Sequence, residues 1–311
     1  MSILKGGVLE LASDLVFRVL VVPGMGRGLF ATHSLPARTA LLEEGPIVST
    51  PPVSKVQDGS WCLACCSPGY ACGHEPGPAS GDLSPLLGYC EEQRFKWPLL
   101  MAQLAARALR RGSSGNCDEA LERMKFLCSV NLKGREERLE EQRKVMLDCF
   151  KGPHGEDVLS IDWYTDFYSR IQANAFRLDL VDSAALGGEE VSYQAVLRKM
   201  LAQQEDGDGG SAVYTIASLF NHSCGMYWIA STAHHIRTTA AHPLTRAPVP
   251  NVDVAFPKND HTIVLRTNQD VRENEQLTIS YIDTDADVEE RASRLAMYGF
   301  RCECEKCREE R

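Results

Sequence analysis

Apolar and polar positions follow two different periods along the chain. Residues 15–22 and 39–44 are short, mostly apolar runs bounded by turns with proline or glycine, a pattern typical of β-strands. Residues 277–282 alternate, with Leu277, Ile279 and Tyr281 on one side of a predicted strand. We expect all three segments to lie in small β-sheets.

The middle of the chain has a helical period. Apolar residues recur every three or four positions over residues 99–109 and 120–127, on either side of a glycine- and serine-rich break. A further helix over 161–173 would deliver Asn174 at its end. The charged segment 133–144 predicts a solvated helix rather than a binding site. Together the two periods indicate an α+β fold.

Residues 51–96 fit neither period, because proline, glycine, serine and cysteine dominate them. Two interpretations of this segment stay open: it holds one zinc ion, or it is a loop with free thiols. The residues that could supply a zinc site here, a possible second one in the chain, are Cys62, Cys65, Cys66, Cys72, His74 and Cys90.

Composition excludes several classes of protein. The 311-residue chain is 44% hydrophobic, which suits one large domain or two small ones. It has no apolar run of about eighteen residues and no secretory signal at its start, so we expect no membrane span and no secretion. Its twelve cysteines therefore indicate zinc ligands and reduced thiols rather than disulfides. The net charge of −9 disfavours a nucleic-acid binder and suits a basic peptide partner.

A cysteine group near the C-terminus carries the clearest metal chemistry. Cys302, Cys304 and Cys307 have C-x-C-x2-C spacing and are one thiolate short of a tetrahedral zinc site. Cys224, which ends the sequence Asn-His-Ser-Cys, can supply the fourth. Zinc with four sulfur ligands has no open coordination position, so such a site would be structural and would clamp the tail to the Asn221 segment.

A glycine-rich turn near the N-terminus is a candidate ligand loop. Residues 24–31 read Gly-Met-Gly-Arg-Gly-Leu-Phe-Ala, and glycine lets the backbone approach a ligand closely. Arg27 would be available for a carboxylate. A G-x-G sequence alone also fits an ordinary hairpin turn.

These motifs, in this order, resemble the SET-domain protein-lysine methyltransferases, most closely the branch with SET and MYND domains. The resemblance covers residues 15–307 and rests on G-R-G-L-F-A at 26–31, N-A-F at 174–176, S-L-F-N-H-S-C at 218–224, E-Q-L-T-I-S-Y at 275–281 and Y-G-F-R-C-E-C at 298–304. It implies SET-type β-sheets with a knot-like crossing of the Asn221 segment and the C-terminal strand. It also implies S-adenosylmethionine and zinc as cofactors.

The resemblance assigns roles to individual residues. Tyr281 corresponds to the tyrosine at the methyl-transfer centre, and Cys224 to a ligand of the zinc that the tail cysteines hold. The positions that correspond to the cofactor pocket are Met25, Gly26, Arg27, Asn174, Ser218, Asn221, His222, Tyr281 and Phe300. The implied partner is a lysine-containing protein, a histone tail or another protein. The implied state is a monomer in the cytoplasm or nucleus.

The resemblance also implies a domain plan: a split SET core at 15–50 and 174–300, a MYND-like remnant at 51–96, a helical insert at 97–173, a loop insertion at 225–249 and a zinc-binding tail at 301–311. Three departures stand out. The finger has too few ligands for two zinc ions, the loop insertion interrupts the family pattern, and Asn274 replaces a glycine that precedes the E-x-L motif. Asparagine tolerates left-handed backbone, so we expect that turn to survive. An alternative function is a catalytically weak SET protein that acts as a zinc-bearing interaction module.

Overall fold

The computed structural model describes residues 3–5, 8–10, 15–59, 61–63, 66, 82–111, 118–150, 155–178, 209–225 and 250–311. The chain divides into two compact units. The first comprises Met1–Glu10, Glu43–Ser218 and Ala255–Val264, and the second comprises Leu11–Leu42, Leu219–Val254 and Leu265–Arg311. The loop insertion, apart from Gly225, lies outside the described residues.

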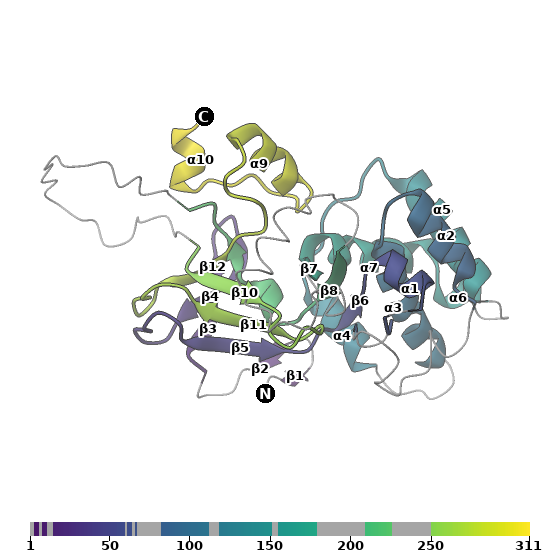
Figure 1. Ribbon diagram of the computed structural model, residues 1–311, viewed down its shortest axis with the longest axis horizontal. Coiled ribbons are helices and arrows are strands. Elements are labelled where there is room, and N and C mark those ends of the chain that lie inside the picture. Colours follow the sequence, from purple (N-terminus) through teal and green to yellow (C-terminus); the bar gives the residue numbers. More distant parts are fainter. Residues whose placement is uncertain are drawn as a thin grey trace, which may run out of the picture. The chain divides into compact units, whose positions relative to one another are not determined.

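The first unit is mainly helical, as the spacing of its apolar residues predicts. Leu99, Leu100, Met101 and Leu104 are completely buried in its core, and Asp118 and Ser160 cap two of its helices with their side-chain oxygens. The helices are α1 (Val53–Gln57), α2 (Ser84–Glu92), α3 (Trp97–Arg111), α4 (Glu119–Phe126), α5 (Glu136–Cys149), α6 (Gly155–Val158) and α7 (Ile161–Asn174) (Figure 1). Helix α7 ends at Asn174, as expected.

The charged helix differs from its prediction. Helix α5 begins at Glu136, and the expectation that it is merely solvated was wrong, because it buries Leu139, Gln142, Met146 and Cys149. These positions are three or four residues apart and form one face. The charged residues cover the opposite face, which is why the sequence there looks uniformly polar.

The short strands of the first unit form two small sheets. Strand β8 (Gly210–Val213) pairs antiparallel with both β6 (Val48–Thr50) and β7 (Ala175–Leu178). A hairpin of β1 (Ile3–Lys5) and β2 (Val8–Glu10) makes the other. Because α7 ends at Asn174 and β7 begins at Ala175, the chain passes directly from this helix into an edge strand.

A four-stranded sheet in the order β3-β4-β12-β9 organises the second unit. Its strands are β3 (Phe17–Val22), β4 (Gly26–Ala31), β9 (Asn221–His222) and β12 (Gln276–Ile279) (Figure 1). A further sheet, whose strands have residues in both units, has the order β10 (Val252–Ala255), β11 (Ile263–Thr267) and β5 (Ala40–Glu44). Two helices, α9 (Val288–Ala296) and α10 (Glu305–Glu309), complete the C-terminal region.

Strand β12 is more buried than its alternating sequence predicts. It pairs antiparallel with β4 on one side and parallel with β9 on the other. Leu277, Thr278 and Ile279 are all buried, and the strand ends at Ile279, so Tyr281 lies beyond it. The predicted strand to residue 282 was therefore too long. The Asn221 segment pairs with this strand as β9, and the knot-like crossing itself stays a prediction.

The completely buried Asn251 holds β12 by its main chain. The main-chain N–H and side-chain Oδ1 of Asn251 pair with the carbonyl oxygen and N–H of Thr278 at 3.1 and 2.9 Å. Its Nδ2 donates to the Gln276 carbonyl oxygen at 2.9 Å. Each of these buried polar groups is thereby satisfied.

The turn before β12 has the predicted left-handed residue. Asn274 has φ 64°, and its side-chain oxygen accepts a hydrogen bond from Arg18 of β3. Asparagine adopts this conformation more readily than most residues, so the replacement of glycine is accommodated. None of the described helices has the length and apolar character needed to cross a bilayer.

Glu44, the last residue of β5, fastens the segment that leads into the Ser218–Cys224 motif. Its two carboxylate oxygens accept backbone N–H groups of Thr215, Ile216 and Ala217 at 2.8–3.1 Å. Burial raises the pKa of the Glu44 carboxyl, and these N–H donors act against that rise. The carboxylate thus replaces a strand partner for three consecutive residues.

We predict that Glu44→Gln destabilises the fold. Glutamine would place an NH2 group against one or two backbone N–H donors, so the free energy of unfolding should fall by about 1–3 kcal/mol. Urea denaturation followed by circular dichroism measures this. Glu43→Gln is the matched control, because Glu43 is exposed and forms only a surface ion pair with Lys258, and it should change stability by less than about 1 kcal/mol. Equal stabilities of the two variants would contradict the prediction.

Candidate metal centre and active site

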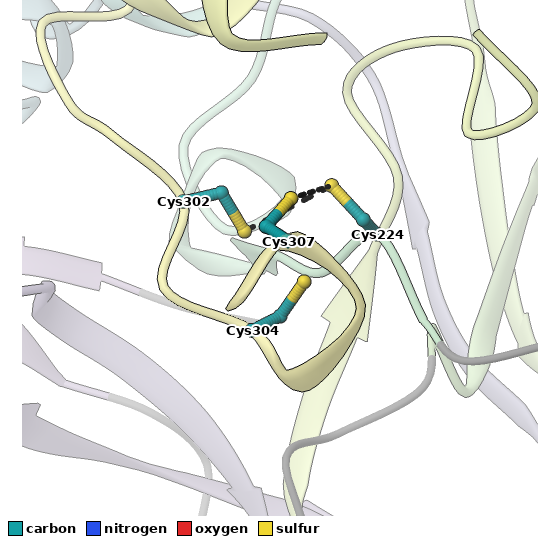
Figure 2. Close-up of side chains that lie close together, drawn as sticks. All are labelled: Cys224, Cys302, Cys304 and Cys307. Carbon is teal, nitrogen blue, oxygen red and sulfur yellow. Dashed lines mark hydrogen bonds between the residues drawn. The ribbon is translucent and has the colours of Figure 1, made fainter. Parts of the chain in front are cut away.

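Four cysteines from two distant parts of the second unit converge on one point. Cys224 follows β9, Cys302 and Cys304 precede α10, and Cys307 lies within it. Their sulfur atoms all lie within 4.8 Å of one another, and Figure 2 shows the side chains turned inward. The expected set of four ligands is therefore brought together.

The spacing of the sulfur atoms fits zinc. Tetrahedral geometry with Zn–S bonds of about 2.3 Å places neighbouring sulfurs about 3.8 Å apart. The Cys224 sulfur lies 3.8 Å from that of Cys302 and 3.5 Å from that of Cys307. These separations are far longer than a disulfide bond of about 2 Å. The cluster could thus hold one zinc ion with no coordination position left for a substrate.

The thiols influence each other's ionisation. The neighbouring thiols of Cys224 and Cys302 donate to Cys304 and hold its pKa well below the ordinary value. Hydrogen bonding to Cys302 and Cys304 raises the pKa of Cys224. One thiolate is thereby favoured within the group, and a thiolate is the form that binds metal.

Two side chains outside the cluster donate to its sulfurs. Arg291 of α9 is 1% exposed, and its guanidinium lies 3.7 Å from the Cys307 sulfur and forms an ion pair with Glu310. His222 Nε2 lies 3.0 Å from the Cys224 sulfur. Such contacts from a second layer of residues orient metal ligands and offset the negative charge of four thiolates.

Tyr281 lies against the same centre. Its hydroxyl donates to the Phe220 carbonyl oxygen at 2.6 Å, and its main-chain N–H donates to His222 Nδ1 at 3.0 Å. The ring is 5.1 Å from Tyr298 and 6.2 Å from Phe300, measured between centroids. Tyr281, Tyr298 and Phe300 pack against the buried cysteines, so the aromatic group and the metal centre form one cluster.

His222 is buried and neutral in character. It is 4% exposed, and burial lowers the pKa of its imidazole to about 4. Its ring lies 5.3 Å from Tyr281 and 6.1 Å from Phe300. The prediction that Cys224 rather than His222 belongs to the sulfur cluster agrees with the geometry, since no imidazole nitrogen is among the clustered ligand atoms.

A notch at Gly28 brings two side-chain amides together. A Cβ built on Gly28 would lie 2.7 Å from both Asn221 Nδ2 and Gln276 Nε2, so a larger residue here would displace these two side chains. Both nitrogens are buried without a hydrogen-bond partner among the described residues. Orphaned donors of this kind are rare and mark a place where a ligand's oxygen atoms fit. Residues of the glycine-rich turn, β9 and β12 therefore share one polar notch.

The other predicted site residues are spread more widely. Met25, which is 44% exposed, lies in the β3–β4 turn, and Gly26, with φ 77°, and Arg27 are the first two residues of β4. Asn174 and Ser218 belong to the first unit. There, Asn174 donates to the carbonyl oxygens of Cys128 and Arg170, and Ser218 donates to that of Tyr214. Their assignment to a cofactor pocket stays a prediction.

The possible second zinc site is only partly described. Cys65, Cys72 and His74 lie outside the described residues. Cys66 donates to Ser49, and Cys90 lies in the helical core, where burial raises its pKa to about 12. In the described ranges, the C-terminal cysteines form the one group that could hold a metal. Both interpretations of this segment stay open.

Sequence reasoning missed Gln276 and Arg291. Gln276 belongs to the recognised 275–281 motif but received no role, and its place next to Asn221 could have been found only from the pairing of β12 with β9. Arg291 is one of several charged residues on an amphipathic helix, and nothing in its spacing marks it as buried. Both acquire their roles through partners remote in sequence.

Comparisons with known proteins agree with these features. The family model of the SET domain matches residues 26–282. The chain is 26% identical to the histone-lysine N-methyltransferase ATXR4 of Arabidopsis thaliana, over 93% of this chain and 85% of that protein. It is 32% identical to a SET and MYND domain-containing protein of Dictyostelium discoideum and 28% identical to the protein-lysine N-trimethyltransferase SMYD5 of Gallus gallus. Both matches cover 32% of this chain, and they cover 22% and 19% of those relatives.

A solved structure is similar over most of the chain. The SET domain of LSMT, bound to lysine and AdoHcy, is 13% identical with a TM-score of 0.46, and the match covers 94% of this chain and 54% of that one.

We predict that the purified protein contains zinc at the four-cysteine cluster. Elemental analysis should find about one zinc per chain, or about two if residues 62–90 also bind. Cys304→Ser should lower the content by about one ion, because a serine hydroxyl is a poor zinc ligand. Cys128→Ser, at an exposed cysteine of the first unit that is not among the four, is the control and should keep the full content. Unchanged zinc in Cys304→Ser would overturn the assignment.

Proposed function

Because this chain belongs to the SET-domain family, we propose that it is an S-adenosylmethionine-dependent protein-lysine N-methyltransferase. The family model covers residues 26–282, which include the glycine-rich turn, β9, β12 and Tyr281. The observation that carries the proposal is that the two residues of β9 contact both regions: Asn221 lies beside Gly28, and His222 Nδ1 accepts from the Tyr281 N–H. The relatives are named as histone-lysine and protein-lysine methyltransferases, which supports the same chemistry.

The notch is the proposed place for the polar end of the cofactor. Asn221 Nδ2 and Gln276 Nε2 are donors with nothing to bond in the described part of the chain, and a carboxylate would satisfy both. Arg27 lies next to Gly28 in β4 and would add positive charge. Met25, Gly26, His222 and Phe300 are the further proposed contacts in this unit. S-adenosylmethionine, when bound, supplies an electrophilic methyl group on a sulfonium.

Tyr281 is the proposed catalytic residue. Its two hydrogen bonds, one from the hydroxyl and one from the main chain, hold the phenol in one orientation. A fixed phenol oxygen can orient an attacking amine and stabilise charge that changes in the transition state. Orientation matters because transfer between two bound reactants requires a narrow range of approach.

The aromatic group around Tyr281 suits a lysine side chain. A free lysine has a pKa of about 10.4 and is mostly protonated at neutral pH, whereas attack requires the neutral amine. Tyr281, Tyr298 and Phe300 offer apolar surface that would exclude water from the amine and lower its pKa. Burial also raises the pKa of the Tyr298 hydroxyl, so this residue stays neutral beside the amine.

The substrate is proposed to be a lysine-containing protein. ATXR4 and ATXR2 of Arabidopsis thaliana are named as histone-lysine methyltransferases, which favours a histone tail and action in the nucleus. SMYD5 is named as a protein-lysine methyltransferase without reference to histones. The other possible substrate is therefore a non-histone protein, with action in the cytoplasm. The net charge of −9 is favourable for a basic peptide of either kind.

The direct test is transfer of a labelled methyl group from S-adenosylmethionine to proteins of a cell lysate, with modified lysines identified by mass spectrometry. We predict that Tyr281→Phe lowers turnover about 100-fold or more, because it removes a hydroxyl that acts mainly in the transition state. Cofactor affinity, measured by calorimetry, should stay within about twofold. Tyr89→Phe in α2 is the matched control and should keep turnover. Normal turnover in Tyr281→Phe would refute the catalytic assignment.

We also predict that Asn221→Ala weakens cofactor binding. Loss of one donor to a charged group should raise the dissociation constant about tenfold or more, equivalent to about 1.4 kcal/mol. Asn268→Ala, at an exposed asparagine after β11 in the same unit, is the control. A protein that binds no cofactor in calorimetry would instead be the zinc-bearing interaction module. Parallel losses of stability and affinity in Asn221→Ala would mean that Asn221 is purely structural.

A further inference from the structure

We infer that the imidazole of His222 is a positioning residue that couples the four-cysteine cluster to Tyr281. One ring nitrogen, Nε2, lies 3.0 Å from the Cys224 sulfur, and the other, Nδ1, lies 3.0 Å from the main-chain nitrogen of Tyr281. The side chain is 4% exposed, so neither contact is shared with solvent. The inference rests on the proposed role of Tyr281 and adds a second residue to that site.

The hydrogen-bond partners determine which nitrogen carries the proton. The backbone N–H of Tyr281 can only donate, so His222 Nδ1 must accept and carries no hydrogen. A neutral imidazole then has its hydrogen on Nε2, which faces the Cys224 sulfur. The ring therefore donates from Nε2 to the Cys224 sulfur and accepts at Nδ1 from the Tyr281 N–H. A cysteine that ligates a metal is a thiolate, and charged acceptors make the stronger hydrogen bonds.

Tyr281 depends on this contact because of where the strand ladder ends. Strand β12 stops at Ile279, whose carbonyl oxygen accepts from the Ser223 N–H at 3.0 Å. Tyr281 lies two residues further along, beyond the paired part of the strand. Its N–H is held by His222 and its hydroxyl by the Phe220 carbonyl oxygen. Both bonds therefore come from residues 220–222, a segment that is tied to the cluster at Cys224.

Arg291 shows that the coupling belongs to His222 rather than to every neighbour of the cluster. It also donates toward a cysteine, Cys307, but its other bonds go to Glu310 and to the Ala286 carbonyl oxygen. A change at Arg291 should therefore weaken metal retention without reaching Tyr281. A substitution at His222 can weaken metal retention, loosen Tyr281, or do both, depending on which of the two ring nitrogens the new side chain replaces.

Two substitutions separate the two bonds of His222. In His222→Asn, the side-chain Oδ1 takes the place of Nδ1 and keeps the acceptor for Tyr281, while the donor to Cys224 is lost. In His222→Gln, the amide nitrogen reaches the position of Nε2 and keeps the donor to Cys224, while the acceptor for Tyr281 is lost. Each variant is thus the conservative rescue of the bond that the other breaks.

The experiment uses the full zinc-loaded chain and three measurements. Zinc release to a chromophoric chelator reports the cluster, hydrogen exchange of the Tyr281 amide reports the main-chain bond, and steady-state kinetics with S-adenosylmethionine report turnover. We expect His222→Gln to keep zinc release within about twofold, to speed exchange of the Tyr281 amide about tenfold, and to lower kcat about tenfold with KM little changed. We expect His222→Asn and the control Arg291→Lys to speed zinc release about tenfold, with exchange of the Tyr281 amide at saturating zinc within about threefold of the wild type.

Removal of zinc from the wild-type protein by a chelator gives an independent arm. If the coupling is present, exchange of the Tyr281 amide rises on chelation, and the rise is smaller in His222→Asn, which has already lost the link. Equal effects of His222→Asn and His222→Gln on all readouts would overturn the inference, as would a Tyr281 amide insensitive to both variants and to chelation. Absence of methyl transfer in the wild type would refute the proposed function alone, because zinc release and amide exchange still test the coupling.

Discussion

Asn221 and His222 pair in parallel with Thr278 and Ile279, and this short β9–β12 register determines what the second unit can do. It places Cys224 where the tail cysteines can reach it, turns Asn221 toward Gly28, and leaves Tyr281 beside Phe220 and His222. A parallel pair needs a long connection between its strands, and here the chain supplies β10 and β11 within it. A slip of one residue would turn His222 away from both the cysteine and the tyrosine, because neighbouring side chains point to opposite faces of a strand.

Polar side chains, more than apolar packing, hold this register. Asn251 satisfies the main chain of β12 at Gln276 and Thr278, and Glu44 satisfies three successive N–H groups ahead of the Ser218–Cys224 motif. Buried hydrogen bonds of this kind contribute little to net stability when made, yet leaving them unmade is costly. They therefore select one arrangement of the chain over alternatives of similar apolar burial.

The cysteine cluster has a different physical role. Cys224 and Cys302 are 78 residues apart, and a metal that binds both closes a loop whose ends would otherwise meet at a cost in chain entropy. Four thiolates and one zinc ion carry a net charge of −2, which a buried site tolerates when donors surround the sulfurs. Arg291 and His222 supply such donors at two different cysteines, Cys307 and Cys224. The aromatic residues packed on it then share the rigidity that the metal gives.

The sequence by itself determined the features that depend on local spacing: helices α3, α4, α5 and α7, the strands near residues 17–22 and 40–44, and the set of four cysteines. The order of short motifs was enough to indicate the family. Tertiary structure alone decided the burial of Thr278, the depth of Arg291 and the meeting of Gln276 with Asn221. It also decided that the His222 ring joins residues 2 and 59 positions away. Periodicity reports which face of an element is apolar, whereas the partner of a buried polar group depends on which distant element lies opposite.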